Sequence, residues 1–210
     1  MAASQSYINR RLHSLLGVVP IGLFLIIHFV VNHYAVDGAP AFNKAAGFME
    51  NLPFLVYLEW IFIYLPLLFH GIYGLYIAFQ TSSNVGSNSF FRNWMYLFQR
   101  ISGVFLVIFI GWHVWQTRIQ MAMGEPLNFQ MMADILSNPF FFWFYIIGVI
   151  SAVFHFSNGL WSFCVTWGLT ITPRSQLIVT YVTLAIFIIL SVIGIRAVLA
   201  FTNPQYAMLF

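Results

Sequence analysis

Charged residues are scarce in this sequence of 210 residues. Asp, Glu, Lys and Arg together make up 6% of it, whereas hydrophobic residues make up 61%. A soluble domain has about 25% charged residues, so this composition excludes an ordinary soluble protein. The net charge of +3 is spread along the chain, and it therefore gives no indication of nucleic-acid binding.

Cysteine is almost absent as well. Cys164 is the single cysteine, so the chain cannot form an internal disulfide. There is no Cys-x-x-Cys-His motif, which excludes covalent attachment of a c-type haem. The sequence also lacks a cysteine cluster and a flavin-binding fingerprint, so it has no site of its own for an iron–sulfur cluster or a flavin.

Long hydrophobic runs, by contrast, occupy most of the chain. A bilayer core about 30 Å thick takes roughly 20 apolar residues per helix. Five runs of this kind predict transmembrane helices near residues 12–36, 54–79, 94–115, 140–169 and 177–201. The first run follows a polar segment and lacks a small-residue cleavage pattern, so we expect it to remain in the mature protein. The prediction is one all-α, multi-pass membrane domain over residues 1–210.

The positive charges favour a cytoplasmic N-terminus. With this orientation five arginines lie on the inner side, and only Lys44, Arg118 and Arg196 lie outside. The inner arginines are Arg10, Arg11, Arg92, Arg100 and Arg174. All five carboxylates then fall in the outer half or the outer loops: Asp37, Glu50, Glu59, Glu125 and Asp134.

The two outer connections are amphipathic. Residues 39–53 place Phe42, Ala45, Ala46 and Met49 on one helical face, and residues 125–139 do the same with Met131, Met132 and Ile135. We therefore expect two short surface helices, each followed by a proline, Pro53 or Pro139, near the start of the next membrane helix. The inner connections, "TSSNVGSNS" and "TPRSQ", are polar and predict turns.

Four histidines occur at regular intervals in the apolar runs. His28, His70, His113 and His155 lie one on each of the first four predicted helices, 42 or 43 residues apart. Successive helices run in opposite directions, so this interval places alternate histidines at matching depths. The sequence thus predicts one pair, His28 with His113, near the outer face and a second, His70 with His155, deeper toward the inside.

Glycines accompany these histidines. Gly74 and Gly159 each follow an inner-pair histidine by four residues, on the same helical face. Gly17 and Gly103 precede His28 and His113 by about three turns, at the depth of the inner pair. A glycine removes side-chain bulk, so these four positions leave room for a flat macrocycle against the backbone.

The same features form an internal repeat. Five equivalent pairs are 85 or 86 residues apart: Gly17 and Gly103, His28 and His113, Pro53 and Pro139, His70 and His155, Gly74 and Gly159. The first two helices therefore match the third and fourth. We expect these four to form a bundle that holds the histidines, with the fifth helix packed alongside.

Paired imidazoles in a membrane indicate a metal site. Zinc normally takes four ligands and would call for Cys, Asp or Glu nearby, whereas two imidazoles on facing helices with glycine clearance are typical of b-type haem. The sequence therefore predicts two haem b groups. A single histidine in a membrane helix is often only a packing residue, and we interpret His13 and His33 as interface residues at the ends of the first helix.

Other polar residues lie within reach of the predicted cofactors. The inner ends of the first and third helices carry possible partners for haem propionates: Arg11, Ser14, Arg100 and Ser102. Arg11 can equally extend toward the lipid headgroups. Asp37, Glu50 and Glu59 are candidates for proton exchange at a quinone site, although ordinary solvation accounts for each of them taken singly.

The chain also resembles a known family. The segments "RRLHSLLGVVPIGLFLIIHFVVNHYA", "LPLLFHGIYGLYIAF", "GWHVWQTR" and "FHFSNGLWSF" are similar to the five-helix, dihaem cytochrome b558 membrane anchors of succinate dehydrogenases from Gram-positive bacteria. The resemblance implies that His28 and His113 ligate an outer, low-potential haem and that His70 and His155 ligate an inner, high-potential haem.

It further implies a place in the bacterial plasma membrane, with a flavoprotein subunit and an iron–sulfur subunit on the cytoplasmic face. Succinate oxidation would then supply electrons, and menaquinone would be reduced near the outer haem. Three alternatives stay open: the anchor of a fumarate reductase, the dihaem anchor of another quinone-linked enzyme such as a hydrogenase or formate dehydrogenase, and a haem-free transporter or channel that uses histidines as proton relays.

Overall fold

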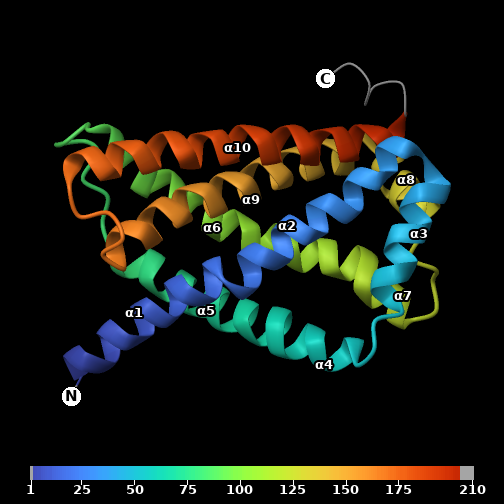
Figure 1. Ribbon diagram of the computed structural model, residues 1–210, viewed down its shortest axis with the longest axis horizontal. Coiled ribbons are helices and arrows are strands. Elements are labelled where there is room, and N and C mark those ends of the chain that lie inside the picture. Colours follow the sequence, from blue (N-terminus) through green and yellow to red (C-terminus); the bar gives the residue numbers. More distant parts are fainter. Residues whose placement is uncertain (1, 204–210) are drawn as a thin grey trace. The chain divides into compact units, whose positions relative to one another are not determined.

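The computed structural model describes residues 2–203, and these residues form helices and connections without any strand (Figure 1). The elements are α1 (Ala2–Val18), α2 (Pro20–His33), η1 (Tyr34–Asp37), α3 (Ala39–Glu50), α4 (Leu55–Glu59), η2 (Trp60–Tyr64), α5 (Leu65–Gln80), α6 (Phe91–Val114), η3 (Trp115–Ile119), α7 (Gln120–Ala122), α8 (Phe129–Ser137), α9 (Pro139–Thr166) and α10 (Pro173–Thr202). The predicted all-α class is confirmed.

Within residues 2–203, five helical stretches are long and apolar enough to cross a membrane, in agreement with the five predicted. They are Ser6–Asp37, Leu55–Gln80, Phe91–Ala122, Pro139–Thr166 and Pro173–Thr202. Many of their large apolar side chains face outward, such as Ile72 with 66% of its surface exposed and Ile147 with 52%. Such surfaces suit a lipid environment, where apolar side chains need no burial inside the protein.

The ends of the last two helices differ from the predicted bounds because local caps set them. α9 ends at Thr166, before the predicted residue 169, since Gly168 adopts a positive φ of 73° and Leu169 N–H bonds back to the Cys164 carbonyl. α10 begins at Pro173 instead of residue 177. Thr172 caps it, because its Oγ1 accepts from Ser175 N–H. Most of "TPRSQ" is therefore helical, and the predicted turn is wrong.

Three membrane stretches contain an irregularity with a local cause. Pro20 has no N–H, and the first stretch divides there into α1 and α2. Pro66 likewise follows the π-helical segment η2, in which Leu65 N–H bonds to the Trp60 carbonyl. In the third stretch Thr117 Oγ1 donates to the His113 carbonyl within 2.7 Å, and the π-helical segment η3 lies at this point. The third stretch continues to Ala122, past the predicted residue 115.

The two amphipathic connections form the expected helices α3 and α8. Phe42 and Ala46 are buried on α3 and Met132 on α8, as their helical faces predict. α8 also buries Leu136, which the sequence analysis did not place on that face. The two helices are joined by a hydrogen bond from Phe129 N–H to the Asn43 side-chain oxygen, 2.7 Å long.

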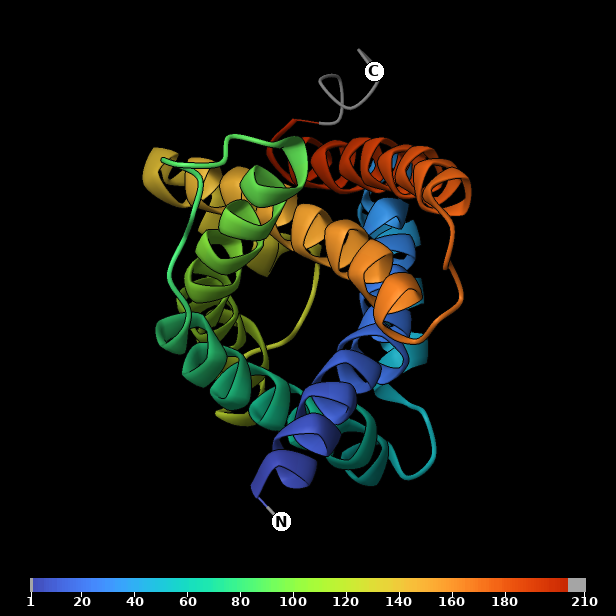
Figure 2. The same ribbon diagram turned by 90° about the vertical axis from the view of Figure 1, so that its left-hand side faces the viewer.

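The chain divides into two compact units. Of the described residues, the first comprises 2–24, 56–104 and 153–187, and the second comprises 25–55, 105–152 and 188–203. In the first unit α1 packs against α5, and both views show these helices crossing (Figures 1 and 2). In the second unit α3 packs against η1 and α8. Each of the helices α2, α6, α9 and α10 has one segment in the first unit and one segment in the second unit.

Candidate functional site

Each predicted histidine pair lies within one of the two units. In the first unit the His70 and His155 ring centroids are 6.1 Å apart, with planes inclined by 85°. In the second unit the His28 and His113 centroids are 5.7 Å apart, with planes inclined by 77°. The structure thus brings together the same partners that were paired from sequence spacing.

His70 is held by α1. Its Nδ1 lies 2.9 Å from the main-chain carbonyl oxygen of His13, and a carbonyl can only accept, so Nδ1 carries the hydrogen. The His13 ring also stacks on the His70 ring, with centroids 4.0 Å apart and planes 6° apart. Interpreting His13 as an interface residue missed this contact. One signal was available, because Gly17 follows His13 by four residues, as Gly74 follows His70.

His155 is held by two polar side chains of the first unit, one of which is supported by a third. Ser102 Oγ lies 3.2 Å from His155 Nδ1 and 3.1 Å from the Gln99 carbonyl oxygen. Gln99 Nε2 donates to the His155 carbonyl at 2.9 Å, while Gln99 Oε1 accepts from Asn158 Nδ2 at 2.8 Å. The serine gives its hydrogen to the Gln99 carbonyl, so its oxygen is available to accept from His155 Nδ1.

His113 has an equivalent arrangement in the second unit. Its Nδ1 lies 3.2 Å from the Tyr145 hydroxyl oxygen, and this hydroxyl donates to Gln116 Oε1 at 3.3 Å. Phe109 stacks on the ring at 6.0 Å between centroids. Tyr145 is 3% exposed, so its hydroxyl has little access to solvent and depends on these two partners.

His28 has its polar neighbour on the same helix. The amide nitrogen of Asn32 donates to the His28 carbonyl at 2.8 Å and lies 3.4 Å from His28 Nε2. The His28 carbonyl and the His113 carbonyl therefore each accept from the side chain four residues later, Asn32 in one case and Thr117 in the other. These hydrogen bonds account for the polar residues Asn32 and Thr117, which follow His28 and His113 in the sequence.

Two of the predicted clearance glycines lie directly against histidine rings. A Cβ atom at Gly17 would clash with the His70 ring, 2.8 Å from Nδ1, and one at Gly103 would lie 2.9 Å from His155 Cε1. A Cβ atom at Gly74 would instead lie 3.1 Å from His13 Nε2, and one at Gly159 would lie 3.3 Å from Gln99 Nε2. All four glycines are in the first unit, with the pair whose ligand they were predicted to accommodate.

These pairs fit an iron that brings its own macrocycle better than a bare ion. Among residues 2–203 no three His, Cys, Asp or Glu side chains gather in a set that could hold a metal ion. A porphyrin iron needs only two protein ligands. Hydrogen bonds at Nδ1 of His70, His113 and His155 favour the tautomer that leaves the Nε2 lone pair free for iron.

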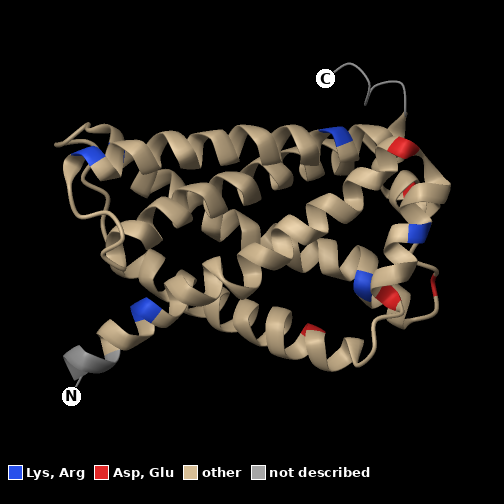
Figure 3. Cartoon of the chain, in the orientation of Figure 1, with Lys and Arg blue, Asp and Glu red and all other residues tan. Residues whose placement is uncertain are grey.

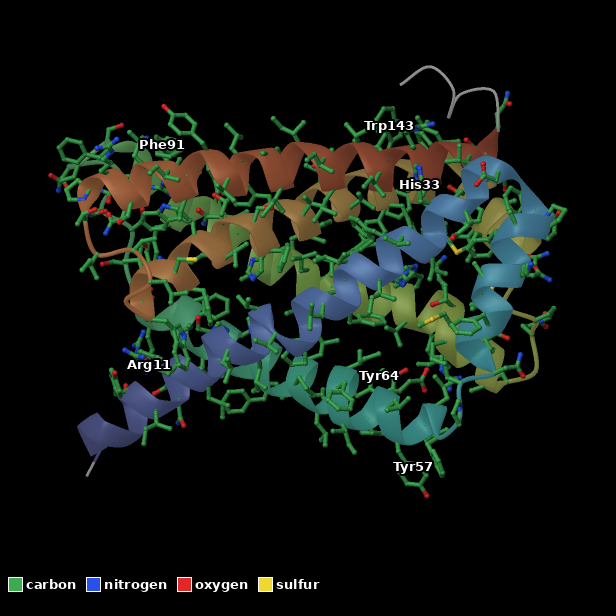
Figure 4. All side chains as sticks on the ribbon, viewed as in Figure 1. Arg11, His33, Tyr57, Tyr64, Phe91 and Trp143 are labelled. Carbon is green, nitrogen blue, oxygen red and sulfur yellow. The ribbon has the colours of Figure 1, made fainter. Side chains whose placement is uncertain are left out.

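The residues predicted to bind propionates all lie in the first unit. The Arg11 guanidinium, on α1 in Figure 4, lies 4.9 Å from the ring centroids of both Tyr7 and Trp167, and its buried Nε has no hydrogen-bond partner among the residues that the structure describes. Arg100 donates to the Ala78 carbonyl. Ser14 is half-buried on α1, and the Ser102 hydroxyl is engaged with His155. Arg11 is thus the member with an unsatisfied donor.

Acidic residues gather in the second unit. Asp37 lies on η1, Glu50 on α3, Glu125 in the connection between α7 and α8, and Asp134 on α8. Figure 3 draws the acidic positions in red. Glu59, the third predicted quinone residue, belongs to the first unit, so the structure does not group it with Asp37 and Glu50. The predicted quinone set is therefore divided between the units.

Two acidic residues of the second unit have distinctive surroundings. Asp37 lines a groove of about 220 Å³ with Val30, His33, Tyr34 and Ile193, where His33 Nδ1 lies 3.4 Å from the Ile193 carbonyl (Figure 4). Glu50 Oε1 is buried and has no hydrogen-bond partner within the described part of the chain, and burial raises the pKa of this carboxyl although the nearby Arg118 opposes the shift. A carboxyl with a raised pKa holds its proton to higher pH and can act as a proton donor.

Comparison with known proteins gives two matches. Residues 82–194 match the family model described as "Succinate dehydrogenase/Fumarate reductase transmembrane subunit". Over 201 residues the chain is 57% identical to the "Succinate dehydrogenase cytochrome b558 subunit" of Bacillus subtilis (strain 168), and the match covers 96% of this chain and 100% of that protein. Both matches agree with the five apolar helices.

Proposed function

Because this chain belongs to the family of succinate dehydrogenase/fumarate reductase transmembrane subunits, we propose that it is the membrane-anchor cytochrome b subunit of a bacterial succinate dehydrogenase. As a multi-pass membrane protein of this family, it holds two b haems and passes electrons from an iron–sulfur subunit to menaquinone. The relative's name and the two histidine pairs support this function over a haem-free transporter.

The observation that carries the proposal is the pairing of histidines within each unit. His28 and His113 would hold one haem, and His70 and His155 would hold the other. When bound, the haems supply one-electron reduction and reoxidation at iron. The chain's own part is to present one ring nitrogen from each of the four histidines, to exclude water around them and, at Gly17 and Gly103, to leave the space that the His70 and His155 rings occupy.

The partners follow from what this chain cannot supply. The chain has a single cysteine and no flavin fingerprint. A separate flavoprotein therefore oxidises the dicarboxylate, and an iron–sulfur subunit delivers the electrons to this chain. Both dock on the cytoplasmic face, at the side where the chain has most of its arginines. We also propose Arg11, with its unpartnered Nε, as a propionate partner of the haem in the first unit, together with Ser14 and Arg100.

We place menaquinone reduction in the second unit, near His28 and His113. The groove at Asp37 is apolar on the side of Val30 and Ile193 and carries the ionisable side chains of His33 and Asp37, which suits an apolar quinone that takes up protons on reduction. Glu50 is a second proton source, because its raised pKa keeps the acid form available.

Replacing either acid with its amide tests this placement. Asp37→Asn and Glu50→Gln should each lower menaquinone-analogue reduction in the assembled complex by on the order of 10-fold or more, since proton donors contribute factors of this size or larger. Reduction of the haems by succinate should be unchanged. The Glu50-dependent part of the rate should fall as the pH rises through the raised pKa, and the Gln variant should lack that decline.

Glu125→Gln is the matched control, because Glu125 is exposed in the connection before α8. Full quinone reduction in both Asp37→Asn and Glu50→Gln would refute the placement of the quinone at these residues. It would leave the haem assignment untouched.

The function itself is tested by a dithionite-reduced minus oxidised absorption spectrum of the purified complex, with a pyridine haemochrome assay to count haem per chain. We expect b-type absorption bands and about two haems per chain, one for each histidine pair. A folded complex without haem would overturn the proposal. Comparing rates of succinate oxidation and fumarate reduction in the same preparation tests the direction, for which the relative's name favours oxidation.

A further inference from the structure

Two buried hydroxyl groups stand behind the histidines, and the mechanism above does not use them. Tyr145 is 3% exposed and Ser102 is 7% exposed. Their oxygens each lie 3.2 Å from the Nδ1 atom of one histidine, His113 for the tyrosine and His155 for the serine. Each unit thus contains one histidine whose Nδ1 atom lies within hydrogen-bonding distance of a hydroxyl oxygen.

We propose that Tyr145 and Ser102 are positioning residues that set the ring orientation of His113 and His155 and, through these rings, the reduction potential of one haem each. The inference rests on the proposed function, because it takes both histidines as haem ligands. It assigns Ser102 to the histidine instead of to a propionate.

The direction of the hydrogen bonds follows from the next partner in each chain. The Tyr145 hydroxyl gives its one hydrogen to Gln116 Oε1, and the Ser102 hydroxyl gives its hydrogen to the Gln99 carbonyl. Neither oxygen has a second hydrogen to donate. A neutral imidazole that binds iron through Nε2 carries its one hydrogen on Nδ1, so each hydroxyl oxygen accepts from the imidazole, and the Nε2 lone pair points away from the hydroxyl.

Both hydroxyls are themselves held in place. Gln99, which accepts from Ser102, also donates to the His155 carbonyl and accepts from Asn158. The Tyr145 ring packs edge-on against His113, with centroids 5.6 Å apart, and against Phe109 at 5.5 Å. A fixed acceptor restricts rotation of the imidazole about its Cβ–Cγ bond, so the ring plane is defined before a haem binds.

An acceptor at Nδ1 makes the imidazole a more basic ligand. A more basic ligand favours ferric over ferrous iron and lowers the potential. Removing the acceptor should therefore raise the potential of the haem that this histidine ligates, and it should leave the haem in the other unit unchanged. The second histidine of the first unit, His70, donates to a main-chain carbonyl, which no side-chain substitution removes.

The test uses Tyr145→Phe and Ser102→Ala in the complete complex, since both variants keep the ring or the Cβ and lose only the hydroxyl. Redox titration of the haem absorption bands gives both potentials, and electron paramagnetic resonance of the ferric haems reports the angle between axial imidazole planes. We expect each variant to change the ferrous-to-ferric ratio of one haem by on the order of tenfold at a given applied potential. For one electron this change equals a shift of about 59 mV in the reduction potential of that haem. The two variants should shift different haems.

Three further variants separate positioning from general damage. Ser102→Thr keeps a hydroxyl and should retain the native potential even if Ser102→Ala loses haem. Tyr181→Phe removes an exposed hydroxyl on α10, and Ser191→Ala removes a buried hydroxyl without a hydrogen-bond partner, so both should leave the potentials unchanged.

Unchanged potentials and resonance spectra in Tyr145→Phe and Ser102→Ala, with both haems present, would overturn the inference alone. Equal shifts of both haems in one variant would also overturn it, because a local contact acts on one ligand. Absence of haem from the unmodified complex would instead refute the proposed function.

Discussion

His70→Ala should leave the complex with one b haem, and His28→Ala should leave it with the other. Each histidine is half of a pair that lies within a single unit, so losing one imidazole removes one of the two side chains that would hold that haem without changing the second pair. Alanine has no side-chain atom that can bind haem iron, so it cannot replace a haem-ligating histidine. A pyridine haemochrome assay should show about half the haem per chain in each variant, and redox titration should show that different haems remain.

His33→Ala is the matched control for this pair of variants. His33 lies in the same membrane stretch as His28, and its Nδ1 lies near the Ile193 carbonyl instead of near another imidazole. It should therefore retain two haems. If His28→Ala and His70→Ala both kept two haems, or if both lost the same one, the two-pair assignment would be wrong.

The sequence predicted the fold at the level of whole helices. Hydrophobic runs of membrane length show where a chain crosses the bilayer, and five such helices occur. The end of α9 and the start of α10 were less predictable. Gly168 and the Thr172–Ser175 cap set them through single hydrogen bonds, which leave no trace in the average hydropathy of the sequence. The division at Pro20 was likewise missed, since an apolar run continues through it.

The pairing of histidines was predictable for a geometrical reason. Antiparallel helices joined at equal intervals bring alternate residues to the same depth, and the ring distances of His28 to His113 and of His70 to His155 agree with that pairing. The supporting side chains were not predictable. Tyr145 comes from a different membrane helix than His113, and aromatic residues make up 20% of the chain, so nothing in the sequence distinguishes this one.

Gly17→Ala should remove the haem held by His70 and His155. A Cβ atom at residue 17 would lie 2.8 Å from His70 Nδ1, which real Cβ atoms do not approach, so the ring must move. It cannot move freely, because His13 stacks on it at 4.0 Å and the His13 carbonyl holds Nδ1. A displaced imidazole no longer presents Nε2 to the iron. The haem count should fall by about half, with the remaining haem showing the potential of the His28 and His113 site.

Gly103→Ala should act on the same haem but less strongly, since its Cβ would lie 2.9 Å from Cε1 and 3.5 Å from Nδ1 of His155, whereas a Cβ at residue 17 would lie 2.8 Å from Nδ1 of His70 and closer still to its Cε1. Gly111→Ala on α6 and Gly71→Ala on α5 are the controls, because a Cβ at either position meets nothing within 4 Å. Both should keep two haems. Loss of haem from the controls as readily as from Gly17→Ala would mean that any added methyl group disturbs these helices. A full haem complement in Gly17→Ala would mean that the His70 ring leaves its position over Gly17 when it binds iron.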